Sequence, residues 1–310
     1  MLQCEQANAA LRDAIVDGLN TVEGLNTESA ERLRGLLGGC TSTLEVALWK
    51  ENGSLHARID TAQRCKHRAC PICSDSKNRR ELVSIRPKLE ALGKAYPKDG
   101  FLKYTLTIPS VGISQAKDAL PRLRAAHSRL YPRWGTKGTK YWIEVPVGRS
   151  SPWDELIAQP HIHGVALVPK ARVKDLGMFT AELTKLWSDA LKTSDLYQVK
   201  CAPLWMASHG KQVAAAMTWV SYCTKGPCRQ GGMHCGNFGV EENSTPFCVY
   251  LADPLALLAY SEVVYKQRLT ETTGVFRNLA EEIPPSVPAQ KRTYHILRWN
   301  PILASYVPQA

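Results

Sequence analysis

The first hundred residues of the chain change from a helical to a strand-like pattern of apolar positions and back again. Leu11, Ile15 and Leu19 recur at every fourth position, the spacing that places side chains on one face of a helix, and Gly38-Gly39 is a typical stop. The expected elements are helical structure over the first forty residues, strands at 42–50 and 55–60 around an Asn52-Gly53 turn, and a basic helix at 75–95.

From residue 101 onward the pattern alternates regularly between short strands and helices. The expected elements are a strand at 101–108, a helix to about 130 that is interrupted at Pro121, strands at 141–147 and 161–168, a helix at 173–192, a strand at 197–204 and a helix at 211–224. The order predicts an α+β fold, in which a central antiparallel β-sheet is covered by helices on one face and the strands at 141–147 and 161–168 form a hairpin.

These patterns divide the chain into three expected segments. Residues 1–98 form an N-terminal helical and Cys-rich region, residues 99–226 form the α+β core, and residues 227–310 hold the remainder. In the last segment we expect a Gly- and Cys-rich loop, a helix at about 253–269 and a partly ordered tail after residue 283.

The charge balance favours a polyanionic partner. Among the 310 residues, 39 Lys+Arg and 28 Asp+Glu give a net charge of +11, and the usual partners of so basic a chain are nucleic acids and anionic membranes. There is no apolar run long enough to span a bilayer and no signal peptide after Met1, so we predict a cytoplasmic protein that does not bind a membrane. Ten cysteines in such a chain favour metal binding or free thiols over disulfides.

Two histidines at the start of the strand at 161–168 are candidate metal ligands. His161 and His163 are two positions apart, so their imidazoles share one face of the sheet. Glu144 lies on the expected partner strand among apolar residues, where burial of a carboxylate is costly without a cation. Two imidazoles and a carboxylate suit Mn²⁺ or Mg²⁺ and leave positions open for substrate oxygens. The alternative is a pair of structural histidines and an exposed edge-strand glutamate.

Tyr222 and Lys225 are candidate catalytic residues near the end of the expected helix at 211–224, where they share a helical face. A tyrosine oxygen is a poor nucleophile at neutral pH because its pKa is about 10, but a nearby cation or a metal-polarised phosphate removes this handicap. Attack on a phosphodiester would give a covalent phosphotyrosine. Taken alone, the Tyr-x-x-Lys spacing also fits an ordinary core or surface tyrosine.

A cysteine cluster at residues 65–73 predicts a structural zinc site. Cys70 and Cys73 form the C-x-x-C pair that grips tetrahedral Zn²⁺ through two thiolates, and Cys65 supplies a third. The fourth ligand is Cys40 or His67, and spacing does not decide between them. A weaker candidate group for a second metal consists of Cys223, Cys228, His234 and Cys235.

Basic residues follow the cysteine cluster on the expected helix at 75–95. Such residues neutralise DNA phosphates and position a duplex or a single strand without reading its bases. They are Lys77, Arg79, Arg80, Arg86 and Lys88.

Taken in order, these segments resemble the rolling-circle replication initiators of small plasmids, in the one-tyrosine group of the HUH endonuclease superfamily. Residues 101–107, FLKYTLT, look like the family's first motif, and residues 159–167, QPHIHGVAL, look like the second, with its two metal-binding histidines. Residues 219–225, WVSYCTK, look like the third, which supplies the tyrosine nucleophile. The Cys-rich run and the basic helix are similar to the segment that precedes the first motif in this group, so the resemblance covers roughly residues 60–226.

The resemblance implies an HUH endonuclease-like fold with residues 99–226 as the nuclease core. It also implies metal-dependent, site- and strand-specific nicking and joining at a plasmid origin, presented as a single strand or an extruded hairpin. Tyr222 would retain the 5′ phosphate, and the freed 3′-hydroxyl would prime the host polymerase, with a host helicase as a further partner. Lys225 would assist at the phosphate or the metal, and Glu144 would be the third metal ligand, since relatives often place an acidic residue before the histidines.

One position departs from the family pattern. The one-tyrosine group tends to carry a glutamate one helical turn before its tyrosine, used to activate water and end replication, whereas this chain has Thr218 there. Because threonine cannot act as a comparable base, we hypothesise that another carboxylate or a second protomer's Tyr222 takes over termination.

Two other functions remain open. A transposase or conjugative relaxase of the same superfamily would use the same chemistry on another DNA end, and the lack of a G-x-x-x-x-G-K-[ST] loop argues against an attached helicase. A non-catalytic, zinc-dependent DNA-binding regulator would need the cysteine cluster and the basic helix but has no use for the histidine pair and Tyr222.

Overall fold

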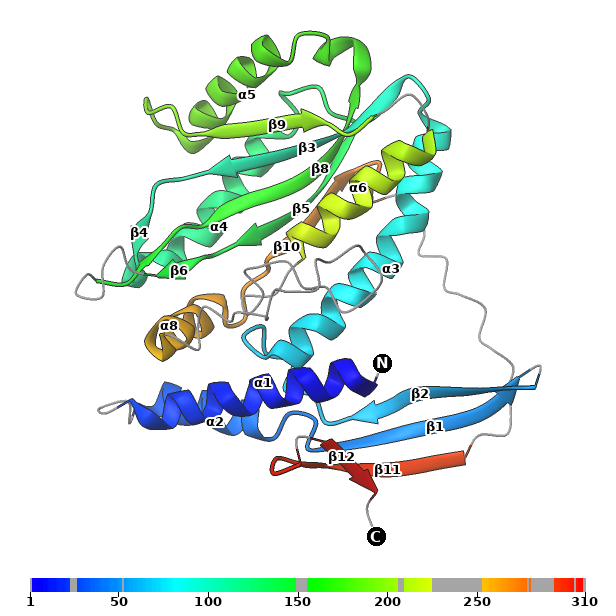
Figure 1. Cartoon of the computed structure of the whole chain (residues 1–310). Helices are drawn as coiled ribbons and strands as arrows, with labels where there is room; N and C mark the ends of the chain where they lie inside the picture. The colour runs from blue at the N-terminus through cyan, green and yellow to red at the C-terminus, as the bar shows by residue number, and fades with distance from the viewer. Residues whose placement is uncertain are drawn as a thin grey trace. The chain divides into compact units, whose positions relative to one another are not determined.

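The computed structural model describes residues 2–22, 27–51, 53–148, 155–205, 209–224, 253–277, 279, 293–303 and 305–308 (Figure 1). The chain divides into two compact units. The first consists of Met1–Lys77, Gly226–Ser261 and Glu282–Ala310, and the second of Asn78–Lys225 and Glu262–Glu281. Among the helices of the described residues, none has both the length and the apolar character that a membrane crossing requires.

The first unit combines helices with a four-stranded antiparallel sheet of order β12-β11-β1-β2. Its elements are α1 (Leu2–Thr21), α2 (Glu28–Gly38), β1 (Thr43–Glu51), β2 (Ser54–Ala62), β11 (Thr293–Asn300) and β12 (Ser305–Pro308). The predicted β1–β2 hairpin and the helix end at Gly38 are confirmed. The side chain of Thr27 caps α2 by accepting a hydrogen bond from the Ala30 backbone N–H.

The prediction of a partly ordered tail after residue 283 did not include the two strands found there, β11 at Thr293–Asn300 and β12 at Ser305–Pro308. β11 pairs with β1 in a register that runs from Thr43↔Arg298 to Leu48↔Thr293, and β12 pairs with β11 on its other side. The partner strand lies far earlier in the chain, so no local pattern of residues reveals this pairing.

The second unit is built on a five-stranded, wholly antiparallel sheet of order β10-β5-β8-β3-β9. Its strands are β3 (Asp99–Thr107), β5 (Gly138–Glu144), β8 (His161–Pro169), β9 (Val199–Pro203) and β10 (Thr270–Gly274). Its helices are α3 (Pro71–Ala95, from residue 78 onward), α4 (Ile113–Leu130), η1 (Lys170–Val173), α5 (Leu176–Leu191) and α6 (His209–Cys223). The predicted α+β fold with a central antiparallel sheet is confirmed, as is the pairing of the strands now called β5 and β8.

Small elements depart from the sequence prediction. A three-stranded sheet of β4 (Val111–Gly112), β7 (Ile157–Ala158) and β6 (Val147–Gly148) was not expected. The helix expected at 253–269 ends early, as α8 (Pro254–Val264), and the threonine-rich β10 that follows pairs with β5 at the edge of the larger sheet.

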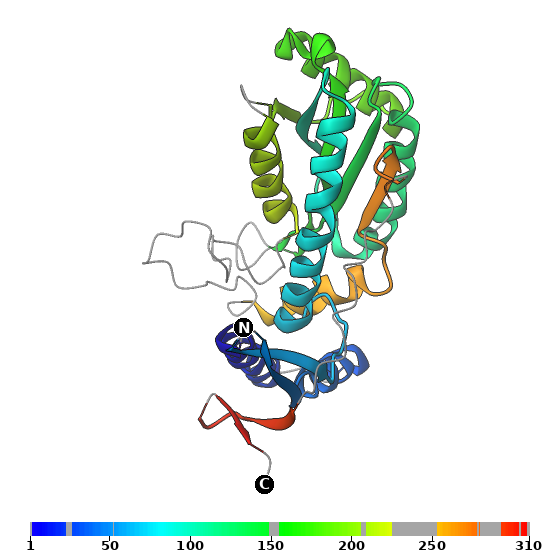
Figure 2. The ribbon, with the colours of Figure 1, turned by 90° about the vertical axis from the view of Figure 1, so that its right-hand side faces the viewer.

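Helices cover both faces of the five-stranded sheet, so the prediction of helices on one face was wrong (Figure 2). The face that carries Phe101, Val165 and Leu167 packs against apolar residues of α3 and α6. On the opposite face, α5 contributes Trp187, whose indole N–H donates to the Thr107 carbonyl oxygen at 2.8 Å. The apolar stripe of an isolated helix shows that the helix packs on something, but it does not show on which face of the sheet.

α4 runs continuously through Pro121, contrary to the predicted interruption. A proline inside a helix removes one backbone hydrogen bond and crowds the preceding turn. The buried Ala116, Leu120 and Leu123 hold α4 against the sheet on both sides of the proline, and this packing outweighs the local penalty.

A buried aromatic contact on the α4 side of the sheet depends on a glycine in β8. Tyr104 Oη lies 3.0 Å from His127 Nε2, and the His127 ring packs against Tyr141 with centroids 4.1 Å apart. Burial lowers the pKa of His127 to about 3, so this imidazole stays neutral. A Cβ added at Gly164 would lie 2.2 Å from Tyr104 Cζ, so only glycine fits this position.

Gly164→Ala is expected to destabilise the second unit by about 1–3 kcal/mol, because the new methyl group overpacks the contact around Tyr104. Gly148→Ala is the control, since an added Cβ at Gly148 meets no atom within 4 Å, and its effect should stay within about 0.5 kcal/mol. Urea unfolding followed by tryptophan fluorescence measures both variants. Equal midpoints for the two would contradict the packing argument.

Candidate functional site

Strand register brings Glu144, His161 and His163 together in the second unit. β8 pairs with β5 so that His161 lies opposite Glu144 and His163 lies opposite Trp142. Side chains directly opposite one another in an antiparallel pair point to the same face of the sheet. The three side chains therefore converge from two strands, without a loop to position them.

These side chains place three ligand atoms around one small gap. His161 Nε2 lies 2.9 Å from His163 Nε2 and 3.3 Å from Glu144 Oε2, and His163 Nε2 lies 2.9 Å from the same carboxylate oxygen. The exposed fraction of the side chain is 14% for His161, 6% for His163 and 22% for Glu144. The three side chains are thus mostly buried, and each keeps part of its surface in contact with solvent.

Hydrogen bonds to the outer ring nitrogens orient both imidazoles. His161 Nδ1 lies 2.8 Å from the Gln159 carbonyl oxygen, which can only accept, so Nδ1 carries the proton and Nε2 presents a lone pair to the gap. His163 Nδ1 lies 2.9 Å from Thr105 Oγ1, which can accept in the same way. A proton on His163 Nε2 can point at His161 or at Glu144 but not at both, whereas all three atoms could serve as ligands of one cation.

The donor set and its spacing fit a divalent cation. Cis ligands about 2.1 Å from an octahedral metal lie about 3 Å apart, which matches the separations of 2.9–3.3 Å found here. Two imidazole nitrogens and one carboxylate oxygen suit Mn²⁺ or Mg²⁺ and leave coordination positions for substrate oxygens. The structure groups Glu144, His161 and His163 as three possible ligands of one metal ion, and the identity of the metal stays a prediction.

The phenol of Tyr222 lies beside the Glu144/His161/His163 gap. Its ring centroid is 5.3 Å from that of His163, with 78° between the ring planes, and Tyr222 is 42% exposed. Trp219, one turn earlier on α6, stacks on Tyr222 with centroids 5.2 Å apart and only 14° between the planes. The tyrosine is therefore held in place and is accessible to a large substrate.

Trp219 was not predicted as a site residue, although it lies within the segment at 219–225. Its indole N–H donates to the Gly164 carbonyl oxygen at 2.8 Å, and the Lys103 ammonium lies 5.2 Å from the centroid of its ring. These contacts tie α6 to β8 and β3 next to His163. The available signal was its spacing, because a residue three positions before Tyr222 shares its helical face.

Some predicted residues cannot be placed. The structure describes the chain after α6 only as far as Thr224. Outside the described residues lie Lys225, Cys228, His234 and Cys235. Thr218, at the position of the family's glutamate, is exposed, and its hydroxyl donates to the Ala214 carbonyl oxygen at 3.2 Å.

The first unit brings four cysteine side chains together. The Sγ atoms of Cys40 and Cys73 lie 3.5 Å apart, those of Cys65 and Cys73 lie 3.6 Å apart, and those of Cys70 and Cys40 lie 3.5 Å apart. Thiolates about 2.3 Å from a tetrahedral Zn²⁺ lie about 3.8 Å from one another. The cluster is therefore close to the size of a four-cysteine zinc site.

The geometry groups Cys40, and not His67, with the other three cysteines. His67 Nδ1 instead accepts a hydrogen bond from the Ala69 backbone N–H at 3.2 Å. Hydrogen bonds from the neighbouring thiols, that of Cys40 first, lower the pKa of Cys73, to which the Lys66 backbone N–H also donates. Hydrogen bonds with the same neighbours, that of Cys40 first, raise the pKa of Cys65 and of Cys70, so the surroundings favour a thiolate at Cys73 and not at these two residues.

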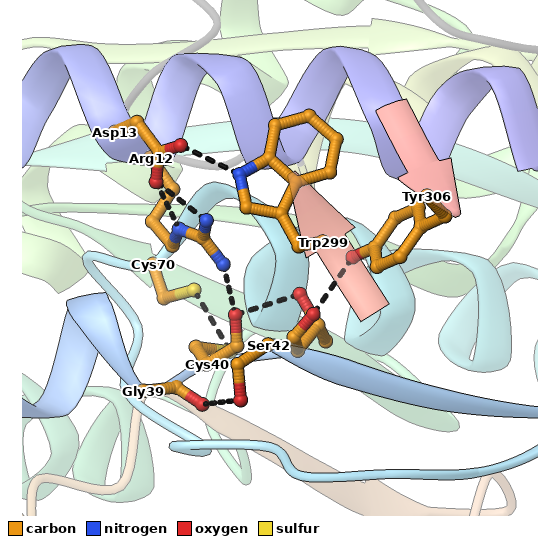
Figure 3. A network of polar contacts seen from close by, with 9 residues as sticks. Arg12, Asp13, Gly39, Cys40, Ser42, Cys70, Trp299 and Tyr306 are labelled. Carbon is orange, nitrogen blue, oxygen red and sulfur yellow. Dashed lines mark hydrogen bonds and ion pairs between the residues drawn. The ribbon is translucent and has the colours of Figure 1, made fainter. Parts of the chain in front are cut away.

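A buried polar network holds the loop that carries Cys40 (Figure 3). Arg12 of α1 is 1% exposed, and its guanidinium donates to the Cys40 carbonyl oxygen. The same guanidinium is paired with Asp13, which accepts a hydrogen bond from the Trp299 indole N–H at 2.7 Å. α1 and β11 thereby support one residue of the cluster. Four thiolates around a Zn²⁺ ion would carry a net charge of about −2, and the positive charge of Arg12 lies near them.

The next residue, Thr41, has a left-handed backbone conformation with φ at 57°, which is uncommon for a β-branched residue. The Thr41 carbonyl oxygen accepts a hydrogen bond from the Tyr306 hydroxyl of β12 at 2.9 Å, and the Thr41 backbone N–H donates to the Gln63 carbonyl oxygen at 2.6 Å. Such a conformation persists only where several contacts hold it. The hydrogen bonds around Thr41 therefore help to fix the direction of Cys40.

The residues predicted to contact DNA lie on α3. Arg80 and Arg86 are exposed, whereas Lys77, Arg79 and Lys88 are half-buried. Their contact with DNA stays a prediction.

Comparison with known proteins identifies the family. The Replication protein family matches residues 56–294, which include Cys65, the Glu144/His161/His163 group and Tyr222. The chain belongs to this family.

Two curated relatives, each named Protein rep, are similar over shorter segments. The relative from Streptococcus pneumoniae serotype 2 is 26% identical over 156 residues, which are 49% of this chain and 48% of the relative. The relative from Staphylococcus aureus is 25% identical over 147 residues, which are 46% of this chain and 63% of the relative. The matches thus span about half of the first relative and less than two thirds of the second. No solved structure shows a significant match.

Thr105→Val is expected to weaken Mn²⁺ binding by about 10- to 100-fold, because His163 loses the hydroxyl that accepts from its Nδ1 and fixes the ring. Thr107→Val is the matched control, since Thr107 shares the strand and the face, but its hydroxyl donates to the Gln198 carbonyl oxygen. Titration calorimetry with Mn²⁺ measures both variants. Equal affinities would show that Thr105 does not orient His163.

Freshly purified protein is expected to contain about one Zn²⁺ per chain, and Cys40→Ser should lose it, because three thiolates hold the ion less tightly than four. His67→Ala should retain the metal, since His67 lies outside the four-cysteine group. Elemental analysis of the purified variants provides the measurement. Loss of zinc in His67→Ala alone would reverse the assignment, and a parent protein free of zinc would reject the site.

Proposed function

We propose that the chain is a plasmid rolling-circle replication initiator, which nicks and rejoins one DNA strand at its origin through Tyr222. The observation that carries the proposal is the Tyr222 ring, 5.3 Å from the His163 ring and beside a gap lined by three possible metal ligands. Membership of the Replication protein family supports a role in replication. The net charge of +11 supports a nucleic-acid substrate.

The proposed reaction is a transesterification, in which the Tyr222 phenol oxygen attacks a phosphorus atom of the DNA backbone. The new O–P bond forms as the P–O3′ bond breaks, which leaves a 5′-phosphotyrosine and a 3′-hydroxyl. The phenol loses its proton and the departing 3′ oxygen gains one, so no water is consumed and the reverse attack can rejoin the strand. A bound Mn²⁺ or Mg²⁺ would polarise the phosphate oxygens and stabilise the developing charge.

Each residue of the site has a separate part in this proposal. Glu144, His161 and His163 hold the cation, while Thr105 orients the His163 ring through its Nδ1. Trp219 holds the plane of the Tyr222 ring by stacking on it. Placement of the nucleophile before the substrate arrives lowers the entropic part of the barrier.

Termination requires a different group from the one used by the one-tyrosine plasmid initiators. Thr218 carries no carboxylate, and its hydroxyl is bonded back to its own helix. Another carboxylate, or Tyr222 of a second protomer, would then release the completed circle. In the same proposal the protein acts in the cytoplasm on a single-stranded or extruded origin, and the host helicase and polymerase extend the 3′-hydroxyl.

Tyr222→Phe is expected to reduce nicking of supercoiled plasmid DNA with Mn²⁺ by at least about 1,000-fold and to abolish the covalent protein–DNA adduct, because the attacking oxygen is removed. Tyr197→Phe is the control, since the Tyr197 hydroxyl bonds Asp195 instead of facing the metal gap. Gel electrophoresis of nicked circles and of the adduct measures both variants.

Two results would redirect the proposal. Retarded migration of plasmid DNA without nicking in the parent protein would favour a DNA-binding regulator. Nicking that survives in Tyr222→Phe would show that another residue is the nucleophile. End mapping of the nicked strand then separates a plasmid initiator from a transposase or relaxase, which acts on a different DNA end.

A further inference from the structure

A pocket of about 640 Å³ lies at the β9 edge of the five-stranded sheet, next to the proposed nucleophile. Its walls come from β3, β8, β9, α5 and α6, and they include His163, Trp219 and Tyr222. Clefts of about 300–1,000 Å³ bind ligands of drug size, a class to which a nucleotide belongs. The pocket therefore has enough volume for one nucleotide of a DNA strand whose reacting phosphate lies at Tyr222.

Two lysines give this pocket its charge. Lys103 of β3 and Lys200 of β9 line it, and the described residues of its lining include no carboxylate. Lys200 is paired in register with Thr105, and Lys103 precedes Thr105 by two positions on the same strand. Both lysines therefore project on the face that carries His163, from backbone positions about 5–7 Å from Thr105.

The remaining walls of the pocket suit the apolar parts of a nucleotide. Trp219, Val199 and Ala202 provide apolar surface, and Thr180 and Cys201 provide neutral polar groups. The Lys103 ammonium lies against the Trp219 ring, 5.2 Å from its centroid, so a cation and an aromatic wall meet at one point. Single-stranded nucleic acid is bound by this combination of positive charge along the backbone and aromatic surface for the bases.

We propose that this pocket holds a nucleotide of single-stranded DNA adjacent to the phosphate that Tyr222 attacks, with Lys103 and Lys200 bound to its backbone phosphate. The inference rests on the proposed function, and it adds two residues that hold the single strand. A nucleotide seated in the pocket would lie next to both Tyr222 and His163, and so would position the strand for attack.

The test measures DNA binding in buffer to which no Mn²⁺ or Mg²⁺ is added, so that cleavage does not occur while the zinc expected in the four-cysteine cluster is retained. The probe is a fluorescein-labelled single-stranded oligothymidylate of twelve nucleotides, and its fluorescence anisotropy is recorded over a series of salt concentrations. Lys103→Gln and Lys200→Gln should each weaken binding about three- to tenfold and reduce the slope of log K against log salt by about 0.7, which corresponds to one fewer neutralised phosphate on a single strand.

Lys117→Gln is the matched control, because Lys117 is an exposed lysine on α4, which covers the other face of the sheet, and its replacement removes the same charge. Lys103→Arg retains the charge and should bind within about twofold of the parent, which separates a phosphate interaction from a disturbed fold. A twelve-base-pair duplex probe should lose no more affinity in the pocket variants than in the control variant.

The outcomes separate this proposal from the nicking proposal. Pocket variants that match Lys117→Gln in affinity and in salt slope would overturn the pocket, even if the parent nicks DNA through Tyr222. Equal losses for the duplex and the single strand would also overturn it, because they indicate a general basic surface. Selective loss of single-strand binding would support a single-strand site in the pocket even where Tyr222→Phe left nicking unchanged, a result that would overturn only the assignment of the nucleophile.

Discussion

The second unit holds three electron-pair donors, on Glu144, His161 and His163, within 3.3 Å of one another. The rest of the site depends on this close grouping. Lone pairs on two imidazoles and a carboxylate repel one another unless positive charge lies between them. The sheet enforces this crowding through its register, since β8 is paired on both sides and cannot shift without breaking two ladders. The folded chain therefore holds three possible metal ligands in place before any substrate binds.

The same packing that stabilises the unit also determines where the phenol lies. α6 buries Val213, Ala216 and Val220 against the sheet, and its next face presents Trp219 and Tyr222 to the gap. A small rotation of the helix would move the apolar residues out of the core and the phenol away from His163 together. The packing of α6 in the core and the position of Tyr222 therefore depend on each other. A substitution that disturbs one is expected to disturb the other.

Local patterns in the sequence were enough for much of this arrangement. The alternation of His161 and His163, and the acidic residue on the neighbouring strand, follow from a period of two and a hairpin, so the convergence of these side chains could be predicted. Trp219 and Thr105 were missed as site residues because their importance comes from partners on other elements. The same holds for β10 and β11, whose strand partners are distant in the chain, and for the face of the sheet that each helix covers.

The pairing of β1 with β11 has a consequence for how the chain is made. At about 5–20 residues per second, the ribosome needs roughly 10–50 s after finishing β2 to synthesise β11 and β12. Throughout that interval β1 keeps an unpaired edge, which is the kind of surface that recruits foreign strands. The loop that carries Cys40 also lacks its support from Trp299 and Tyr306. The four-cysteine grouping therefore gains its last supporting hydrogen bonds only after β11 and β12 have been synthesised.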